Sequence, residues 1–67
     1  MEISARNNLK GRIKEVKLGT IMAEVVVEVG GNEIVAAITR ASAERLGLKV
    51  GDEVSAIVKA TEVMIAK

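Results

Sequence analysis

Two alternating apolar stretches separated by a pair of glycines constrain the fold of this chain more than any other feature. Ile21 to Val29 and Glu33 to Thr39 each place apolar residues at every second position, as half-buried β-strands do. Between them, Gly30-Gly31-Asn32 supplies the positive φ angles of a tight turn. The sequence therefore predicts an antiparallel hairpin whose buried rows are Ala23, Val25, Val27 and Val29 on one strand and Ile34, Ala36 and Ile38 on the other.

A further strand precedes this hairpin. Leu9 to Leu18 also alternates, but its phase slips, so that Val16 and Leu18 fall on the basic face unless the register is reset. A β-bulge near Lys14 or Glu15 would reset it, as happens where barrel strands bend. We therefore predict a bulged first strand followed by a turn at Gly19-Thr20.

A short helix is predicted after the hairpin. The Thr39 hydroxyl can cap the segment Arg40 to Leu46, and Gly47 can end that segment in a left-handed conformation. After a turn at Val50-Gly51-Asp52, the alternation of Val54, Ala56 and Val58 with Ser55, Ile57 and Lys59 predicts a fourth strand.

Lys59-Ala60-Thr61 breaks the pattern of the fourth strand, and Val63 to Ala66 reads as a short fifth strand. Five strands with one short helix between the third and the fourth match the partly open barrel of the oligonucleotide/oligosaccharide-binding (OB) type. We expect an all-β, OB-like, five-stranded Greek-key barrel that forms a single domain over residues 1–67.

The composition excludes several classes of function. Among the 67 residues there is no Cys, His, Pro or aromatic residue, so a catalytic Cys or His, the usual zinc site and a disulfide framework are impossible. The net charge of +1 provides no general attraction for a polyanion. No apolar run approaches membrane-spanning length, and Glu2 and Ser4 are unlike the start of a signal peptide. We expect a cytoplasmic protein that does not bind membranes.

The apolar content predicts self-association. Apolar residues make up 49% of the chain, and five of them fall on faces that should meet water: Val26, Val35, Ala37, Ile57 and Met64. A chain of this size builds only a thin core, and it has no disulfide, metal or aromatic anchor to support it. We therefore expect an obligate oligomer.

Hydrogen-bond donors gather at three places: Ser4 and Arg6 near the start, Thr39 before the helix, and Lys59 with Ala60 and Thr61 after the fourth strand. The motifs Ser-Ala-Arg-Asn, Ala37-Ile38-Thr39, Arg45-Leu46-Gly47-Leu48, Val50-Gly51-Asp52-Glu53-Val54 and Lys59-Ala60-Thr61 occur in this order along nearly the whole chain. In this respect the sequence resembles the molbindins, and also the molybdate-binding domains of molybdate-responsive repressors and importer ATPases.

The resemblance implies a hexamer, arranged as a trimer of dimers, that holds molybdate or tungstate at subunit interfaces for storage and homeostasis of the metal. By this resemblance the oxyanion-binding residues are Ser4, Ala5, Arg6, Lys59 and Ala60 of one subunit and Thr39 of its neighbour. A second class of oxyanion site is also implied, for which Gly19 and Thr20 are the candidates. No cofactor, and no direct protein ligand to the metal, is implied.

The chemistry of the donors agrees with this expectation. Molybdate and tungstate are tetrahedral dianions without a proton at neutral pH, so their ideal site offers hydroxyls, backbone N–H groups, an ammonium and a guanidinium. Phosphate keeps a proton that requires an acceptor, and a site without carboxylates would leave that proton unpaired. The donor set therefore favours molybdate or tungstate over phosphate.

Other readings of the same residues remain open. Arg6 and Lys59 also fit ordinary solvated charges, and Thr39 fits a simple helix cap. The stretch from Leu46 to Val54 is also similar to part of the swapped-hairpin DNA-binding regulators, which makes a transcriptional regulator the alternative function. A nucleic-acid-binding barrel would be expected to carry stacking aromatic residues, and this chain has none. The sequence also contains no recognisable acid/base pair or activated nucleophile, so an enzyme is not expected.

Overall fold

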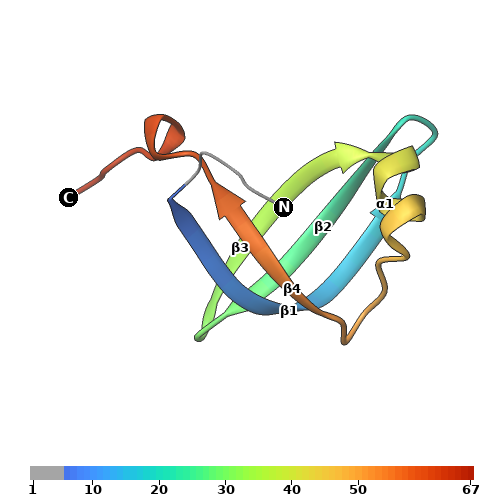
Figure 1. Ribbon diagram of the computed structural model, residues 1–67, viewed down its shortest axis with the longest axis horizontal. Coiled ribbons are helices and arrows are strands. Elements are labelled where there is room, and N and C mark those ends of the chain that lie inside the picture. Colours follow the sequence, from blue (N-terminus) through green and yellow to red (C-terminus); the bar gives the residue numbers. More distant parts are fainter. Residues whose placement is uncertain (1–5) are drawn as a thin grey trace.

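The computed structural model describes residues 6–67. Its centre is a four-stranded antiparallel sheet in the order β3-β2-β1-β4. The elements follow one another as β1 (Asn7–Leu18), β2 (Met22–Val29), β3 (Asn32–Thr39), α1 (Arg40–Leu46), β4 (Glu53–Val58) and the 3₁₀ turn η1 (Ala60–Glu62). Figure 1 shows the sheet as a strongly curved open trough, with α1 at one end and η1 at the other.

The long strand β1 holds the two halves of the sheet together. Its first half pairs with β4 and its second half pairs with β2, and Arg12 lies at the junction of the two pairings. The register with β2 shifts between Ile13 and Glu15, which confirms the predicted bulge near Lys14. A bulge bends a strand and increases its twist, so β1 can pass from one half of the trough to the other.

Gly11 lets β1 approach the β2–β3 hairpin closely. A Cβ atom at this position would lie 2.5 Å from the carbonyl oxygen of Glu28 and 2.8 Å from side-chain methyl groups of Val27 and Val29. No larger residue fits without moving one of the strands, so the curvature of the trough depends on this glycine.

The β2–β3 hairpin confirms the prediction from the sequence. Gly30 and Gly31 have φ angles of 52° and 85°, as a two-residue turn of the hairpin type requires. Asn32, expected in the turn, is already paired with Val29 as the first residue of β3.

The core is small and follows the predicted inward rows only in part. Among residues 6–67, five apolar residues are buried: Ile13, Ala23, Val25, Val27 and Ala43. The predicted row on β3, Ile34, Ala36 and Ile38, is half-buried, because β3 is an edge strand with no described neighbour on its outer side. In a single chain, the fully buried core therefore does not include the residues of β3.

Helix α1 begins and ends as predicted. Thr39 accepts a hydrogen bond at its side chain from the backbone N–H of Ser42, and Gly47 adopts the left-handed conformation with a φ of 63°. Ala43 packs the helix against the trough and is buried. This short helix is held by its two caps, by this contact and by hydrogen bonds from Arg40 to the carbonyl groups of Gly19 and Ile21.

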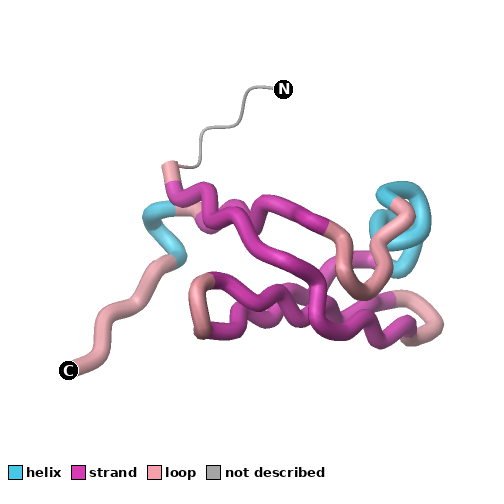
Figure 2. Tube along the Cα trace, turned by 90° about the horizontal axis from the view of Figure 1, so that it is seen from below, coloured by secondary structure: helices cyan, strands magenta, loops and turns pink. Residues whose placement is uncertain are grey.

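The predicted fifth strand is wrong for the single chain, and so is the five-stranded barrel. Residues 63–66 form no strand; the chain leaves β4 through η1, and its last residues lead away from the sheet in both Figure 1 and Figure 2. Alternating apolar residues favour a strand only where a sheet edge is within reach, and η1 directs this segment away from both free edges. Among residues 6–67 the sheet therefore stays open between β3 and β4.

Of the five apolar residues expected to face water, four are exposed. The exposed fractions are 60% for Val35, 44% for Ile57 and 92% for Met64, and Ala37 is also exposed. Val26 is half-buried instead, because β2 lies inside the sheet and has neighbours on both sides. Within residues 6–67, the one helix is too short to cross a membrane.

Candidate functional site

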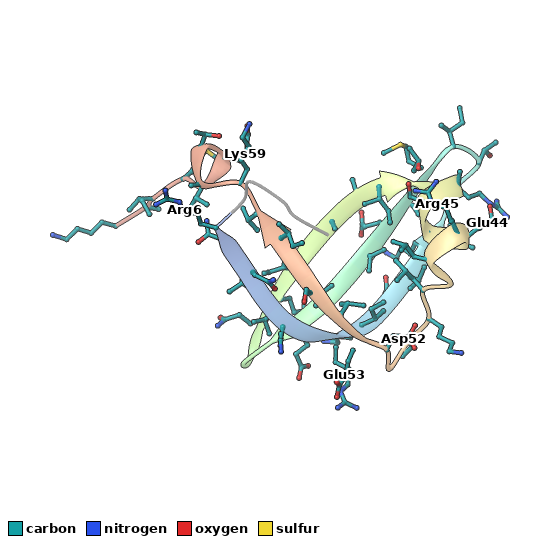
Figure 3. All side chains as sticks on the ribbon, in the orientation of Figure 1. Arg6, Glu44, Arg45, Asp52, Glu53 and Lys59 are labelled. Atoms are coloured by element: carbon teal, nitrogen blue, oxygen red, sulfur yellow. The ribbon has the colours of Figure 1, made fainter. Side chains whose placement is uncertain are left out.

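The pairing of β1 with β4 brings two of the predicted site residues to the same end of the chain. Asn7 at the start of β1 lies opposite Val58 at the end of β4. Arg6 directly precedes Asn7 and Lys59 directly follows Val58, so both cationic side chains emerge beside η1, where Figure 3 labels them. Both residues are exposed. This end of the sheet therefore carries two neighbouring positive charges.

Ala60 is the first residue of the turn that follows Lys59. The turn is closed by hydrogen bonds from the N–H of Glu62 to the carbonyl of Lys59 at 2.9 Å and from the N–H of Val63 to the carbonyl of Ala60 at 3.4 Å. Both bonds use carbonyl groups, and within residues 6–67 the N–H of Ala60 has no partner. This backbone N–H therefore stands next to Lys59 in the chain, with no partner among residues 6–67.

Thr39 lies at the opposite end of the trough, where β3 meets α1. Its Oγ1 accepts a hydrogen bond from the backbone N–H of Ser42 at 3.1 Å and lies 2.8 Å from the Ser42 Oγ. Arg45 donates from Nη2 to the same Ser42 Oγ at 3.5 Å. Two hydroxyls and a guanidinium thus surround the start of α1.

Ser42 and Arg45 were not among the predicted site residues, although the sequence contained a signal for them. Thr39 and Ser42, and again Ser42 and Arg45, are three residues apart, and helix residues at that spacing are neighbours on one face. The hydrogen bonds of Thr39 confirm its role as a cap.

The turn between β1 and β2, which holds Gly19 and Thr20, also lies at the α1 end. Arg40 joins the two elements: its Nη1 donates to the carbonyl oxygen of Gly19 at 3.2 Å, and its backbone N–H donates to the carbonyl oxygen of Ile21 at 2.7 Å. The candidates for a second site are therefore neighbours of α1, at the same end as Thr39.

A single chain does not bring all the predicted site residues together. The molecule is 34 Å long, and Figure 3 shows Arg6 and Lys59 at one end and Arg45 of α1 at the other. Thr39, which caps α1, is thus far from Lys59. Ser4 and Ala5 lie outside the described residues. A site that uses both ends requires two copies of the chain.

The charges at the two ends differ in how they are paired. Four ion pairs occur among residues 6–67, namely Arg12–Glu53, Lys14–Glu33, Lys17–Glu15 and Arg40–Glu44, and none of them involves Arg6 or Lys59. The hydrogen bonds that Lys14 donates to Glu33 and Lys17 donates to Glu15 raise the pKa values of these two lysines. In the part of the chain that is described, no three carboxylates gather as a metal-binding group.

Known proteins resemble this chain over its whole length. The TOBE domain family matches residues 3–65. Molybdenum-pterin-binding protein 1 of Clostridium pasteurianum is 53% identical over 66 residues, which are 97% of each chain.

Solved structures show the same fold. The molybdate-binding protein from Sporomusa ovata superposes with a TM-score of 0.94 at 49% identity, over 100% of both chains. The cytoplasmic molybdate-binding protein ModG, solved with molybdate bound, superposes with a TM-score of 0.84 at 46% identity, over 90% of this chain and 43% of the other. This chain therefore belongs to the TOBE domain family and, within it, to the small molybdenum-pterin-binding and molybdate-binding proteins, the molbindins.

Proposed function

We propose that this protein binds molybdate or tungstate between subunits, with Arg6, Lys59 and Ala60 of one copy and Thr39 of another around the anion. The observation that carries the proposal is the position of Arg6 and Lys59 at the same end of the sheet, beside η1, where neither forms an ion pair with a described residue. Two cations at one place attract a dianion, and charge-assisted hydrogen bonds hold it more strongly than neutral ones.

The separation of the two ends supports a site between copies. Thr39 offers a hydroxyl at the α1 end, whereas Lys59 offers an ammonium and Ala60 a backbone N–H at the η1 end. When one copy packs its η1 end against the α1 end of the next, the complete donor set meets at the interface. Ser4 and Ala5, which precede Arg6 in the sequence, would belong to the same half of the site.

The relatives are named for binding and none for catalysis, in agreement with a binding protein that is not an enzyme. Their names mention both molybdate and a molybdenum-pterin. This chain has no aromatic residue on which a pterin ring could stack, so its donors favour the free oxyanion. We propose storage and buffering of this oxyanion in the cytoplasm, by a homohexamer built as a trimer of dimers.

Isothermal titration with molybdate, tungstate, sulfate and phosphate tests the ligand. Molybdate and tungstate should bind far more tightly than phosphate at pH 7, because the donors leave the phosphate proton without an acceptor. Comparable binding of phosphate would contradict the donor-only site. The absence of heat with molybdate would contradict the function itself.

Analytical ultracentrifugation tests the assembly. Val35→Lys places a charge on an apolar residue that is 60% exposed in the single chain, and it should reduce the sedimenting mass if Val35 lies between subunits. A folded wild-type species of 7.1 kDa would contradict the proposed oligomer.

A further inference from the structure

Arg45 is a cation at the α1 end that no acidic side chain neutralises among residues 6–67. None of the four ion pairs in this part of the chain includes it. Glu44, its neighbour in α1, pairs instead with Arg40, whose Nε lies 3.3 Å from the Glu44 Oε1. Figure 3 labels Arg45 and Glu44 on different sides of the helix. The positive charge of Arg45 is therefore uncompensated within the described part of the chain.

Two successive contacts link this guanidinium to the Thr39 hydroxyl. Arg45 donates from Nη2 to the Ser42 Oγ at 3.5 Å, and the Thr39 Oγ1 lies 2.8 Å from the same Ser42 oxygen. The three residues are spaced by three positions, which places them on one face of the helix. Since the two contacts are 2.8 Å and 3.5 Å long, the Arg45 Nη2 lies within about 6.3 Å of the Thr39 Oγ1. Ser42, which is half-buried, thus holds the guanidinium beside the hydroxyl assigned to the anion.

The η1 half of the proposed site does not fully balance a dianion. Arg6 and Lys59 bring two positive charges to that end, and molybdate or tungstate brings two negative ones. Glu62 of η1 lies three residues after Lys59 and offsets part of the cationic charge. The half that carries Thr39 contributes only a neutral hydroxyl. A third cation on the Thr39 side would therefore favour a doubly charged ligand over a singly charged one.

We propose that Arg45 is a specificity-determining residue of the shared oxyanion site, which selects tetrahedral dianions over tetrahedral monoanions. Its charge acts from the copy that provides Thr39, and Ser42 keeps the guanidinium in place. The attraction between two charges is proportional to their product. Arg45 therefore contributes twice as much free energy to the binding of a dianion as to the binding of a monoanion of the same size. The inference rests on the proposed function, because it requires an anion at Thr39.

Perrhenate is the probe for this selectivity, since it is a tetrahedral oxyanion of a size similar to tungstate but carries one negative charge. Titration calorimetry compares perrhenate with tungstate on the wild type, Arg45→Gln and Arg45→Lys. Glutamine and lysine both favour helices, so neither substitution should unfold α1. Lys49→Gln is the matched control, because Lys49 is an exposed cation beyond the end of α1 that forms no ion pair among residues 6–67.

At low salt, Arg45→Gln should weaken the binding of tungstate about 5- to 20-fold, as expected for a unit charge that acts on a dianion over about 9 Å in largely aqueous surroundings. The loss for perrhenate should be about the square root of that factor. Arg45→Lys should restore most of the affinity, since it keeps the charge, and Lys49→Gln should bind both anions as the wild type does. In about 1 M salt, where the Debye length falls to about 3 Å, the difference between Arg45→Gln and the wild type should largely disappear.

Three results overturn the proposal. One is an equal loss of affinity for tungstate and perrhenate in Arg45→Gln, because the loss of a merely structural contact would not depend on the charge of the ligand. Another is an Arg45→Gln variant that binds both anions like the wild type, in which case the proposed function is retained and the site excludes Arg45. The third is a wild type that binds neither molybdate nor tungstate, which overturns the proposed function as well.

Discussion

Asn7 of β1 lies opposite Val58 of β4, and this pair places Arg6 and Lys59 at the same end of the sheet. Because the strands are antiparallel, the residue before Asn7 and the residue after Val58 emerge at the same end of the sheet. Arg6 and Lys59 thus become neighbours although they are far apart in the sequence.

Removing either cation should weaken molybdate binding without unfolding the protein. Arg6→Ala and Lys59→Ala should each cost about 2 to 5 kcal/mol of binding free energy, the range for deleting one partner of a buried charge pair. Because both residues are exposed in the single chain, the melting temperature without ligand should not fall. Titration calorimetry and thermal melts measure the two effects.

Lys10→Ala is the matched control for these variants, since Lys10 is an exposed cation of β1 outside the proposed site. It should bind molybdate as the wild type does. If Arg6→Ala and Lys59→Ala also bind like the wild type, the anion lies elsewhere.

Thr39 has two roles, and two substitutions separate them. Thr39→Val removes the hydroxyl that accepts from the Ser42 N–H, so it should reduce the free energy of unfolding by about 1 kcal/mol and also weaken oxyanion binding. Thr39→Ser keeps the hydroxyl and should preserve both properties. Urea unfolding and calorimetry of the two variants test this. Weak binding by a stable Thr39→Ser variant would show that the methyl group matters instead.

Gly11→Ala should destabilise the fold by about 1 to 3 kcal/mol, the usual cost of overpacking. The added Cβ would lie 2.5 Å from the carbonyl oxygen of Glu28, which is backbone and cannot move away cheaply. Ser55→Ala, on the exposed face of β4, serves as the control and should stay within about 0.5 kcal/mol of the wild type. Urea denaturation tests this prediction. Equal denaturation midpoints for the two variants would contradict the close approach of β1 to the β2–β3 hairpin at Gly11.

The ion pair between Lys14 and Glu33 should make stability depend on alkaline pH. The hydrogen bond from Lys14 to Glu33 raises the Lys14 pKa above its ordinary value of 10.5. A raised lysine pKa contributes stability that is fully present below 10.5 and is lost as the pH rises through the folded-state pKa. The denaturation midpoint of Glu33→Gln should therefore lie below that of the wild type at pH 9, and the gap should shrink above this pKa. A difference between the two midpoints that stays constant with pH would show that the Lys14–Glu33 ion pair contributes nothing to the free energy of unfolding.

The elements that the sequence predicted correctly are those set by local rules. The Gly30-Gly31 turn, the Thr39 cap and the left-handed Gly47 depend on residues within a few positions of one another, and all three are confirmed. The bulge near Lys14 was visible as a phase slip in the alternation and is also confirmed.

The fifth strand could not be predicted in the same way, because a strand depends on the edge that it meets. Residues 63–66 have the composition of a strand, but the turn at Ala60–Glu62 decides their direction, and in the single chain that direction leads to no edge.

The arrangement of the site residues could not be predicted from local sequence rules either. The resemblance to the molbindins pointed to Arg6, Lys59 and Thr39, whereas only the Asn7–Val58 register and the position of α1 assign them to opposite ends.

Mixing two defective variants tests most directly whether the oxyanion site is shared between copies. Arg6→Ala and Thr39→Val are unfolded together, refolded together and titrated with molybdate. We predict that the mixture regains a fraction of sites with wild-type affinity, because some interfaces combine the intact Arg6 and Lys59 of one variant with the intact Thr39 of the other. If the mixture binds only as weakly as the two parent variants measured separately, the site does not join the two ends of neighbouring copies.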